Sequence, residues 1–342
     1  MDMTIEKTDS NVDKIRSFFT VGRLIAVVIL VTIGWSYSND PIVTVAVLRG
    51  TLRHSTPIIL GALCGLIGER SGIINIGIEG QMLMSAFTAF VVSAWTGSLA
   101  LAIAAGLLTG ALLGLLLAFM SVTLKVDQII GGTVINILAL GLTGFYYSQG
   151  LTTGGKLPFV DLGFLADIPL LGPVLFANNG PLTYTAIVLV VAVHYVLFHT
   201  RWGLRSRAVG EHPRAADTVG INVFMMRYAN VIIAGAIGGL GGVFLTLEGV
   251  GTFERAMTNG RGFLALAVMI FGKWTPFGAW GAALLFGFAF AMQTQVMFSG
   301  VINIPPQFIG MLPYLLTIAI LAGFVGRARP PAAEGIPYEK EG

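Results

Sequence analysis

Polar residues able to do chemistry are few in this sequence, and the clearest group lies between residues 68 and 85 (GERSGIINIGIEGQMLMS). Asn75, Glu79, Gln81 and Ser85 stand there among glycines, at the start of a long apolar stretch. An ionisable side chain such as Glu79 inside an apolar span is costly, so it usually faces protein or a water-filled cavity. These side chains therefore either border such a cavity or hydrogen-bond between neighbouring helices.

A second, smaller polar group lies in a later apolar stretch. Thr133 and Asn136 follow a pair of glycines and are three residues apart, which places them on one face of a helix. Both alternatives stay open for this pair: packing between helices, or a position on the same cavity.

The third feature is a basic segment, residues 201–227 (RWGLRSRAVGEHPRAADTVGINVFMMR), between two apolar stretches. It holds five of the chain's 20 Lys and Arg residues: Arg201, Arg205, Arg207, Arg214 and Arg227. So much positive charge beside apolar spans marks a cytoplasmic loop. Pro213 favours the first turn of a helix and Gly220 favours its left-handed end. The pattern predicts a short helix that a cytoplasmic partner could bind, or an ordinary basic loop with a fortuitous helix.

Composition determines the class of protein in which these groups must be placed. Hydrophobic residues make up 55% of the 342 residues and charged residues 11%, against about 25% charged in soluble domains. We therefore predict an all-α integral membrane protein, surrounded by lipid, whose 45 glycines allow close helix packing. The net charge of +3 arises in the loops and does not indicate nucleic acid. A single cysteine, Cys64, excludes an intrachain disulfide and a cysteine metal cluster.

Apolar stretches predict about ten membrane-spanning helices, most of them near the ~20 residues that crossing requires. They lie at 18–37, 53–68, 72–95, 98–122, 127–147, 181–200, 227–247, 262–272, 277–297 and 308–326. Most Lys and Arg residues fall inside when both termini are cytoplasmic, so we adopt that orientation. Arg49 to His54 fits this scheme least well, and an amphipathic helix on the outer surface is one interpretation of it.

The predicted organisation has three parts. A cytoplasmic N-terminal tail (1–17) precedes a transmembrane domain (18–326), and a cytoplasmic tail (327–342) follows it. The transmembrane domain contains a long outer loop (148–180) and the basic cytoplasmic loop (201–227). The composition of the C-terminal tail, rich in Pro, Ala and Glu, predicts disorder.

Motifs for enzymatic chemistry are absent from the sequence. It contains no nucleotide-binding P-loop, no zinc-protease helix motif and no nucleophile elbow. The chain is therefore not expected to be an enzyme or to hydrolyse ATP. Active transport would need a separate subunit docking on residues 201–227. A secondary carrier or a channel is the alternative of another class, although Glu79 is the one clear embedded carboxylate.

Three stretches together resemble a known family. SGIINIGIEGQMLM, VGEHPRAADTVGINV and AGAIGGLGGVF are similar to the membrane permease of bacterial ABC importers. The most similar branch carries simple sugars and nucleosides and is related to ribose and branched-chain amino acid permeases. The resemblance covers about residues 45–326. The chain departs from the family at His212, where Asn is usual, and His is a weaker helix cap.

The resemblance implies a coupling helix at about 212–220 that inserts into a cleft of a cytoplasmic ABC ATPase subunit. The residues it assigns to coupling are Glu211, His212, Pro213, Arg214, Ala215, Ala216, Asp217 and Gly220. It also implies a second permease chain, identical or homologous, with the translocation pathway between the two. We place Asn75, Glu79, Gln81, Ser85, Thr133 and Asn136 near that pathway.

The remaining parts of such an importer lie outside this chain. An extracytoplasmic substrate-binding protein would dock on the outer loops, in a bacterial cytoplasmic (inner) membrane. No cofactor is expected in this chain, because ATP and Mg would be bound by the ATPase subunit. Nucleosides or simple sugars fit the resemblance best as substrates, and ribose or branched-chain amino acids are the alternatives. At Glu79, we expect Gln to be tolerated better than Ala.

Overall fold

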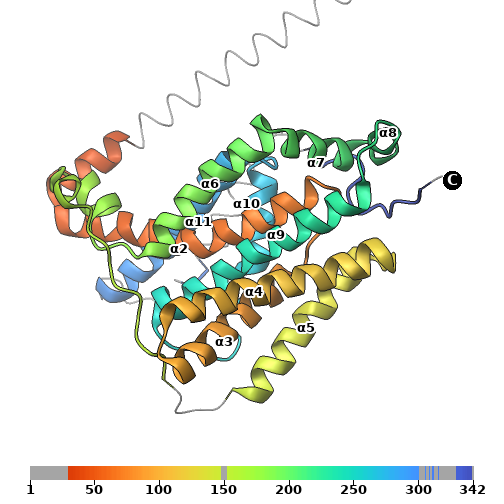
Figure 1. The fold of residues 1–342 in the computed structure, drawn as a ribbon. Helices are drawn as coiled ribbons and strands as arrows, with labels where there is room; N and C mark the ends of the chain where they lie inside the picture. Colours follow the sequence, from red (N-terminus) through yellow and green to blue (C-terminus); the bar gives the residue numbers. More distant parts are fainter. Residues whose placement is uncertain are drawn as a thin grey trace, which may run out of the picture.

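The computed structural model describes residues 30–147, 152–299 and 329–340, with five single positions between 305 and 315. The predicted N-terminal tail, most of the first span and nearly all of the last span (308–326) lie outside these residues. The described chain is helical apart from its connections and one isolated β-bridge, Val160 to Asn179. Its elements are α2 (Pro41–Glu69), α3 (Ile78–Thr96), α4 (Leu99–Ala118), η1 (Phe119–Thr123), α5 (Gln128–Tyr146), η2 (Gly163–Asp167), η3 (Gly172–Phe176), α6 (Pro181–His199), α7 (Arg201–Glu211), α8 (Pro213–Thr218), α9 (Val223–Val243), η4 (Phe244–Val250), α10 (Arg261–Phe271) and α11 (Pro276–Ser299) (Figure 1).

The helical membrane class is confirmed within the described residues. Five helical segments there are long and apolar enough to span a membrane: α4 with η1, α5, α6, α9 with η4, and α11. Their starts follow sequence signals, since Ser98 caps α4, Asp127 caps α5 and Pro181 opens α6. The number of ten spans and the cytoplasmic position of both termini stay predictions.

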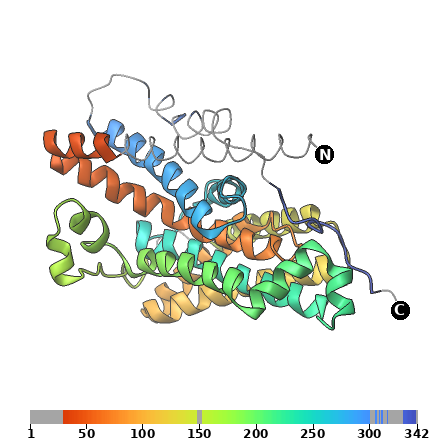
Figure 2. The same ribbon diagram turned by 90° about the horizontal axis from the view of Figure 1, so that it is seen from above.

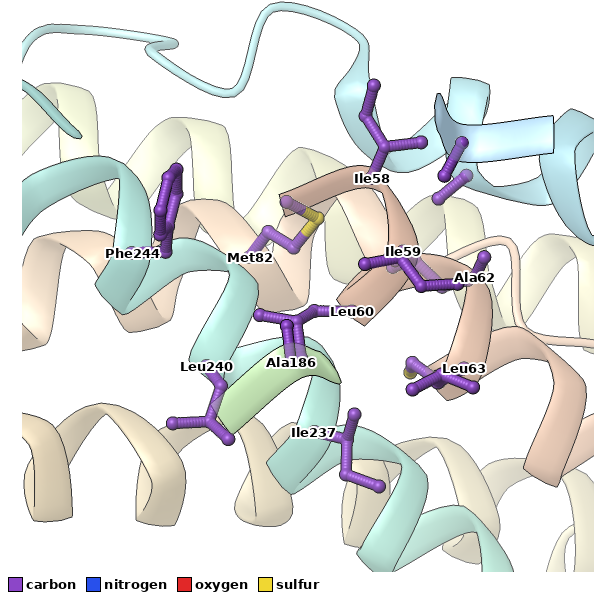
Figure 3. Packing of buried hydrophobic residues seen from close by; sticks show 14 of the residues in the cluster. Ile58, Ile59, Leu60, Ala62, Leu63, Met82, Ala186, Ile237, Leu240 and Phe244 are labelled. Atoms are coloured by element: carbon purple, nitrogen blue, oxygen red, sulfur yellow. The ribbon is translucent and has the colours of Figure 1, made fainter. Parts of the chain in front are cut away.

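Helix α9 with η4 lies at the centre of the bundle. In its most apolar stretch 83% of the residues are buried, against 22% to 33% in the other four long apolar segments. Those four therefore present much of their apolar surface outward, as helices in contact with lipid do. Leu60 of α2, Met82 of α3, Leu240 of α9 and Phe244 of η4 belong to the central cluster around this helix (Figure 3).

Glycines set the distance between α4 and α9, which lie side by side (Figure 1). A Cβ atom added at Gly110 would lie 2.3 Å from the carbonyl oxygen of Gly235, and one at Gly235 would lie 2.3 Å from that of Gly110. No side chain fits between backbones this close. The prediction that glycines allow close helix packing is confirmed at this contact.

The second predicted span is longer than its apolar stretch, so the predicted start at residue 53 is wrong. Helix α2 begins at Pro41, where Asp40 caps it, and runs without a break for 29 residues to Glu69. Arg49 and Arg53 lie inside this helix and not in a separate surface helix. Both charges are bound by backbone carbonyls of distant segments: Arg49 by Pro173, and Arg53 by Glu248 and Gly249. Composition could not reveal these acceptors.

The third predicted span begins later than expected. Residues 70–77 form an irregular link, and α3 starts at Ile78 instead of near residue 72. Gly72 has a φ of +87°, a left-handed conformation that suits glycine. Side chains of α5 bind the backbone of this region, since Gln128 Oε1 accepts from Ile74 N at 2.7 Å. The link is therefore irregular but fixed.

Candidate functional site

The basic loop contains the short helix that Pro213 and Gly220 predict. Helix α7 ends at Glu211, the chain turns at His212, and Pro213 occupies the first position of α8. The His212 side chain makes no capping hydrogen bond. Gly220, with a φ of +83°, ends the helix and donates to the carbonyl of Asp217 at 2.9 Å. The short helix therefore begins and ends where Pro213 and Gly220 predict.

Helix α8 has one face on the protein and one face outward. Ala216 is buried in an apolar cluster with Val209, Val223 and Met226, while Arg214 and Ala215 are exposed. The helix lies at one end of the long bundle (Figure 1). This arrangement presents a small rigid element beyond the ends of the long helices.

The C-terminal segment is not disordered as its composition predicts. Residues 330–339, which we call the C-terminal clasp, lie against α7, α8 and the link before α3 (Figure 2). Ala333 N donates to the carbonyl of Gly210 at 2.9 Å, and Gly335 N donates to that of Gly72 at 3.2 Å. Arg227 donates to the carbonyl of Ile336 at 3.0 Å. The prediction was wrong because these bonds use backbone groups, which composition does not register.

A groove of about 730 Å³ runs between the outer part of α8 and the clasp, which touch each other at its base. It is lined on one side by Glu211, His212, Pro213, Arg214 and Ala215, and on the other by Ala332, Ala333, Ile336, Pro337, Tyr338 and Glu339. Five of the eight residues predicted for coupling thus face one groove. Elsewhere in the clasp, burial raises the pKa of the Glu334 carboxyl, and a hydrogen bond with Glu69 opposes this shift.

Asn75 and Gln81 lie inside the protein at the start of α3. Neither side chain is exposed, and Asn75 Nδ2 donates to Gln81 Oε1 at 3.0 Å. Cys64 Sγ lies 3.4 Å from each of these side chains. The three residues form a buried polar contact between α2 and α3, and Ser85, one turn further along, is also fully buried.

Glu79 caps the start of α10. Its two carboxylate oxygens accept from the backbone N–H groups of Gly260 at 2.8 Å and Gly262 at 2.6 Å. A helix N-terminus favours a negative charge, so this position between α3 and α10 stabilises the carboxylate. Gly260 lies 181 residues after Glu79, so the sequence alone could not indicate that Glu79 caps this helix.

The polar pair on α5 divides between two environments. Asn136 is partly buried and bridges to α3, because its Oδ1 accepts from Gly80 N at 2.7 Å and its Nδ2 donates to the Ile76 carbonyl at 3.0 Å. Thr133 is exposed, and its hydroxyl donates to the Ile129 carbonyl of its own helix. Among the six residues placed near a pathway, Thr133 is the exposed one.

Sequence reasoning missed a second embedded glutamate. Glu248 of η4 is 3% exposed and accepts from the backbone of Leu182 at 2.7 Å, from the backbone of Thr183 at 3.3 Å and from the Thr183 hydroxyl at 2.5 Å. It therefore caps α6 as Glu79 caps α10. Its position directly after an apolar stretch was the available signal. A Cβ atom at Gly180 would lie 2.0 Å from the Glu248 Cδ atom, so a larger residue there would displace the carboxyl group from its hydrogen bonds.

Comparison with known families agrees with these features. Residues 47–321 match the family described as branched-chain amino acid transport system / permease component. The chain belongs to this permease family. The matched region contains α8, both capping glutamates and the glycine contact between α4 and α9.

Three relatives of this permease cover most of its length. The guanosine ABC transporter permease protein NupQ of Bacillus subtilis is 41% identical over 86% of this chain and 96% of its own. The nucleoside ABC transporter permease protein NupC of Lactococcus lactis is 40% identical over the same shares. The putative glucose ABC transporter permease protein TsgC13 of Haloferax volcanii is 35% identical over 80% of this chain and 90% of its own. No solved structure matches the permease.

In the part of the permease that the structure describes, Asn75, Glu79, Asn136 and Glu248 make hydrogen bonds within the protein. No three His, Cys, Asp or Glu residues lie close enough to hold a metal ion within that part. The embedded carboxylates of Glu79 and Glu248 are both engaged with helix N-termini. The relatives are named as transport subunits and not as enzymes, in agreement with the expected class.

Proposed function

We propose that this chain is the membrane permease of an ATP-driven importer that carries nucleosides across the bacterial cytoplasmic membrane. The two relatives at 41% and 40% identity support nucleosides, because their names specify guanosine and nucleoside transport. The relative at 35% identity is named for glucose, which makes a simple sugar the second candidate. The outward apolar faces of the long helices support a multi-pass membrane protein.

Helix α8 carries this proposal. It projects from the end of the bundle, exposes Arg214 and Ala215, and is fixed at its base through the buried Ala216. A cytoplasmic ATPase subunit that binds such a helix could pass its own closing movement on to the membrane helices, because no flexible linker between them would absorb the movement. We therefore assign coupling to Glu211–Gly220, as the resemblance implies.

The translocation pathway is proposed to lie between this chain and a second permease, identical or homologous. The exposed side chain of Thr133 supports a pathway that runs along the outward face of α5. Asn75, Glu79, Gln81, Ser85 and Asn136 would then form the wall behind the pathway and maintain its shape. Selectivity would reside mainly in an extracytoplasmic binding protein, which would dock on the loop between α5 and α6.

The test uses the complete importer in liposomes: this permease, its partner permease, the ATPase subunit and the binding protein. Uptake of labelled guanosine, glucose and ribose is measured with and without ATP. We expect ATP-dependent guanosine uptake. Preferential sugar uptake would replace the substrate assignment, and uptake by this chain alone without ATP would refute the importer in favour of a carrier or channel.

Coupling is tested in the same liposomes with Arg214→Glu and Ala215→Glu. Both side chains are exposed, so these changes should leave insertion and folding intact. Ala216 is unsuitable for this purpose, because it is 3% exposed and a Glu there would disrupt the cluster under α8. We expect uptake to fall while ATP hydrolysis persists. Wild-type uptake and hydrolysis in both variants would refute the docking assignment.

A further inference from the structure

The C-terminal clasp joins parts of the cytoplasmic end that are far apart in the sequence. Its backbone bonds Gly210 at the end of α7 and Gly72 in the link between α2 and α3. These two segments also touch each other, since a Cβ atom at Gly210 would lie 2.3 Å from the Arg70 carbonyl oxygen. Three chain segments therefore meet at one place, and the clasp bonds both of the others.

The clasp also binds a buried cation of α9. The Arg227 side chain is 1% exposed and donates from Nη1 to the Ile336 carbonyl. Its Nη2 lies against the link, since a Cβ atom at Gly72 would be 2.9 Å away from it. A buried guanidinium needs acceptors, so loss of the clasp would expose or strand this charge. The hydrogen bond from Arg227 thus joins the central helix α9 to the clasp and stabilises the ordered conformation of the clasp.

Tyr338 of the clasp packs under the proposed coupling helix. It is 6% exposed and shares an apolar cluster with Ala216 of α8 and with Val209 of α7. Its ring also lies 5.5 Å from that of Phe224 at the start of α9, centre to centre. The inner face of α8 therefore rests in part on a residue of the clasp.

We propose that the C-terminal clasp is a positioning element for the coupling helix, with Tyr338 as its central residue. A force applied to α8 passes through Tyr338 and Ala333 to the Gly72 link and to Arg227, and so reaches α2, α3 and α9 together. This inference rests on the proposed coupling function of α8. It makes the clasp and α8 move as one unit during the transport cycle.

The first test compares Tyr338→Ala with Tyr338→Phe and with Lys340→Ala, the last at an exposed position near the end of the clasp. ATP hydrolysis and nucleoside uptake are measured in the assembled importer. For Tyr338→Ala we expect the ATP consumed per nucleoside transported to rise by about tenfold, within the range common for coupling between sites. Lys340→Ala should give the wild-type ratio. Tyr338→Phe keeps the ring and loses only the hydroxyl that interacts with Arg227, so its ratio should lie between those of the wild type and of Tyr338→Ala.

The ratio distinguishes positioning from a merely structural role, because a smaller amount of folded protein lowers both rates and leaves their ratio unchanged. An unchanged ratio in Tyr338→Ala, together with uncoupling in Ala215→Glu, would overturn the clasp proposal and leave the coupling helix in place. An unchanged ratio in both variants would overturn the coupling assignment and the clasp proposal with it.

A second test applies if Tyr338→Ala does not assemble. Cysteines at Glu211 and Ala332 join α7 to the clasp, where Glu211 Oε2 accepts from Ala332 N at 3.2 Å. The native Cys64 is fully buried and should not interfere. Because Glu211 is itself assigned to coupling, the comparison is made within this double variant: a thiol-specific cross-link between the two cysteines should leave its transport at the rate of its own reduced form. Loss of transport on cross-linking, restored by a reductant, would show that the clasp must release and would overturn the proposal.

Discussion

Replacing Gly110 by Ala should destabilise the bundle, although alanine is the better helix former. The new Cβ atom would lie 2.3 Å from the Gly235 carbonyl oxygen and 2.9 Å from the Gly239 Cα atom. Ordinary contacts of a Cβ atom begin near 3.4 Å, so α4 and α9 would have to separate by roughly 1 Å. Both clashing atoms belong to backbone, which leaves no side chain to rotate away.

Two opposing free energies decide the result. Overpacking of this kind costs about 1–3 kcal/mol, whereas Gly to Ala in a helix gains up to about 1 kcal/mol. Separation of the helices also weakens contacts along their whole length, so we expect net destabilisation of about 1–2 kcal/mol. The matched control is Gly141→Ala on α5, where nothing lies within 4 Å of the new Cβ atom. That variant should be as stable as the wild type or slightly more stable.

The single cysteine provides the assay. Cys64 is fully buried, so a thiol-reactive dye should label it only when the protein unfolds. We expect the midpoint of thermal labelling in detergent to fall for Gly110→Ala and to stay or rise for Gly141→Ala. An equal or higher midpoint for Gly110→Ala would refute the reasoning from backbone contact.

Two further predictions concern Glu79 and the membrane topology. Glu79→Gln keeps one acceptor of the two that bind Gly260 and Gly262, so its labelling midpoint should fall by the equivalent of about 1–3 kcal/mol, and Glu79→Ala should fall further. If Glu79→Gln lost transport with an unchanged midpoint, the charge itself would be required and ion coupling would have to be reconsidered. For topology, cysteines at Phe164 and Ala332, both exposed, should react with an impermeant maleimide from the outside and from the cytoplasmic side respectively; reaction of both from one side would refute the proposed orientation. Residue 335 is less suitable, because a side chain there would meet Ile74 within the clasp contact.

Elements with local signals were predictable from the sequence. The apolar stretches at 98–122, 127–147 and 181–200 agree closely with α4 plus η1, α5 and α6, since Ser98 and Asp127 cap the first two and Pro181 opens the third. Helix α8 was predictable for the same reason, because Pro213 and Gly220 act on their immediate neighbours. In these cases the determining interactions lie within a few residues of the signal.

Elements that depend on distant partners were not predictable. The charge of Arg49 argued against placing this residue in a spanning helix. Arg49 nevertheless lies within α2, where its guanidinium donates to the carbonyl of Pro173, 124 residues away. The C-terminal clasp looked disordered because its partners, Gly72 and Gly210, are also remote in the sequence. Pairing of this kind leaves no periodic or compositional trace in a single sequence.

The roles of the embedded glutamates bear on the source of energy for transport. A carboxylate that binds and releases a coupling ion must be able to change its partners during the cycle. Glu79 is held by two backbone N–H groups, and Glu248 by two more and a hydroxyl, at the starts of α10 and α6. If these carboxylates rotated to bind an ion, the starts of α10 and α6 would lose the groups that cap them. Their geometry therefore favours fixed structural anchors over binding sites for a coupling ion.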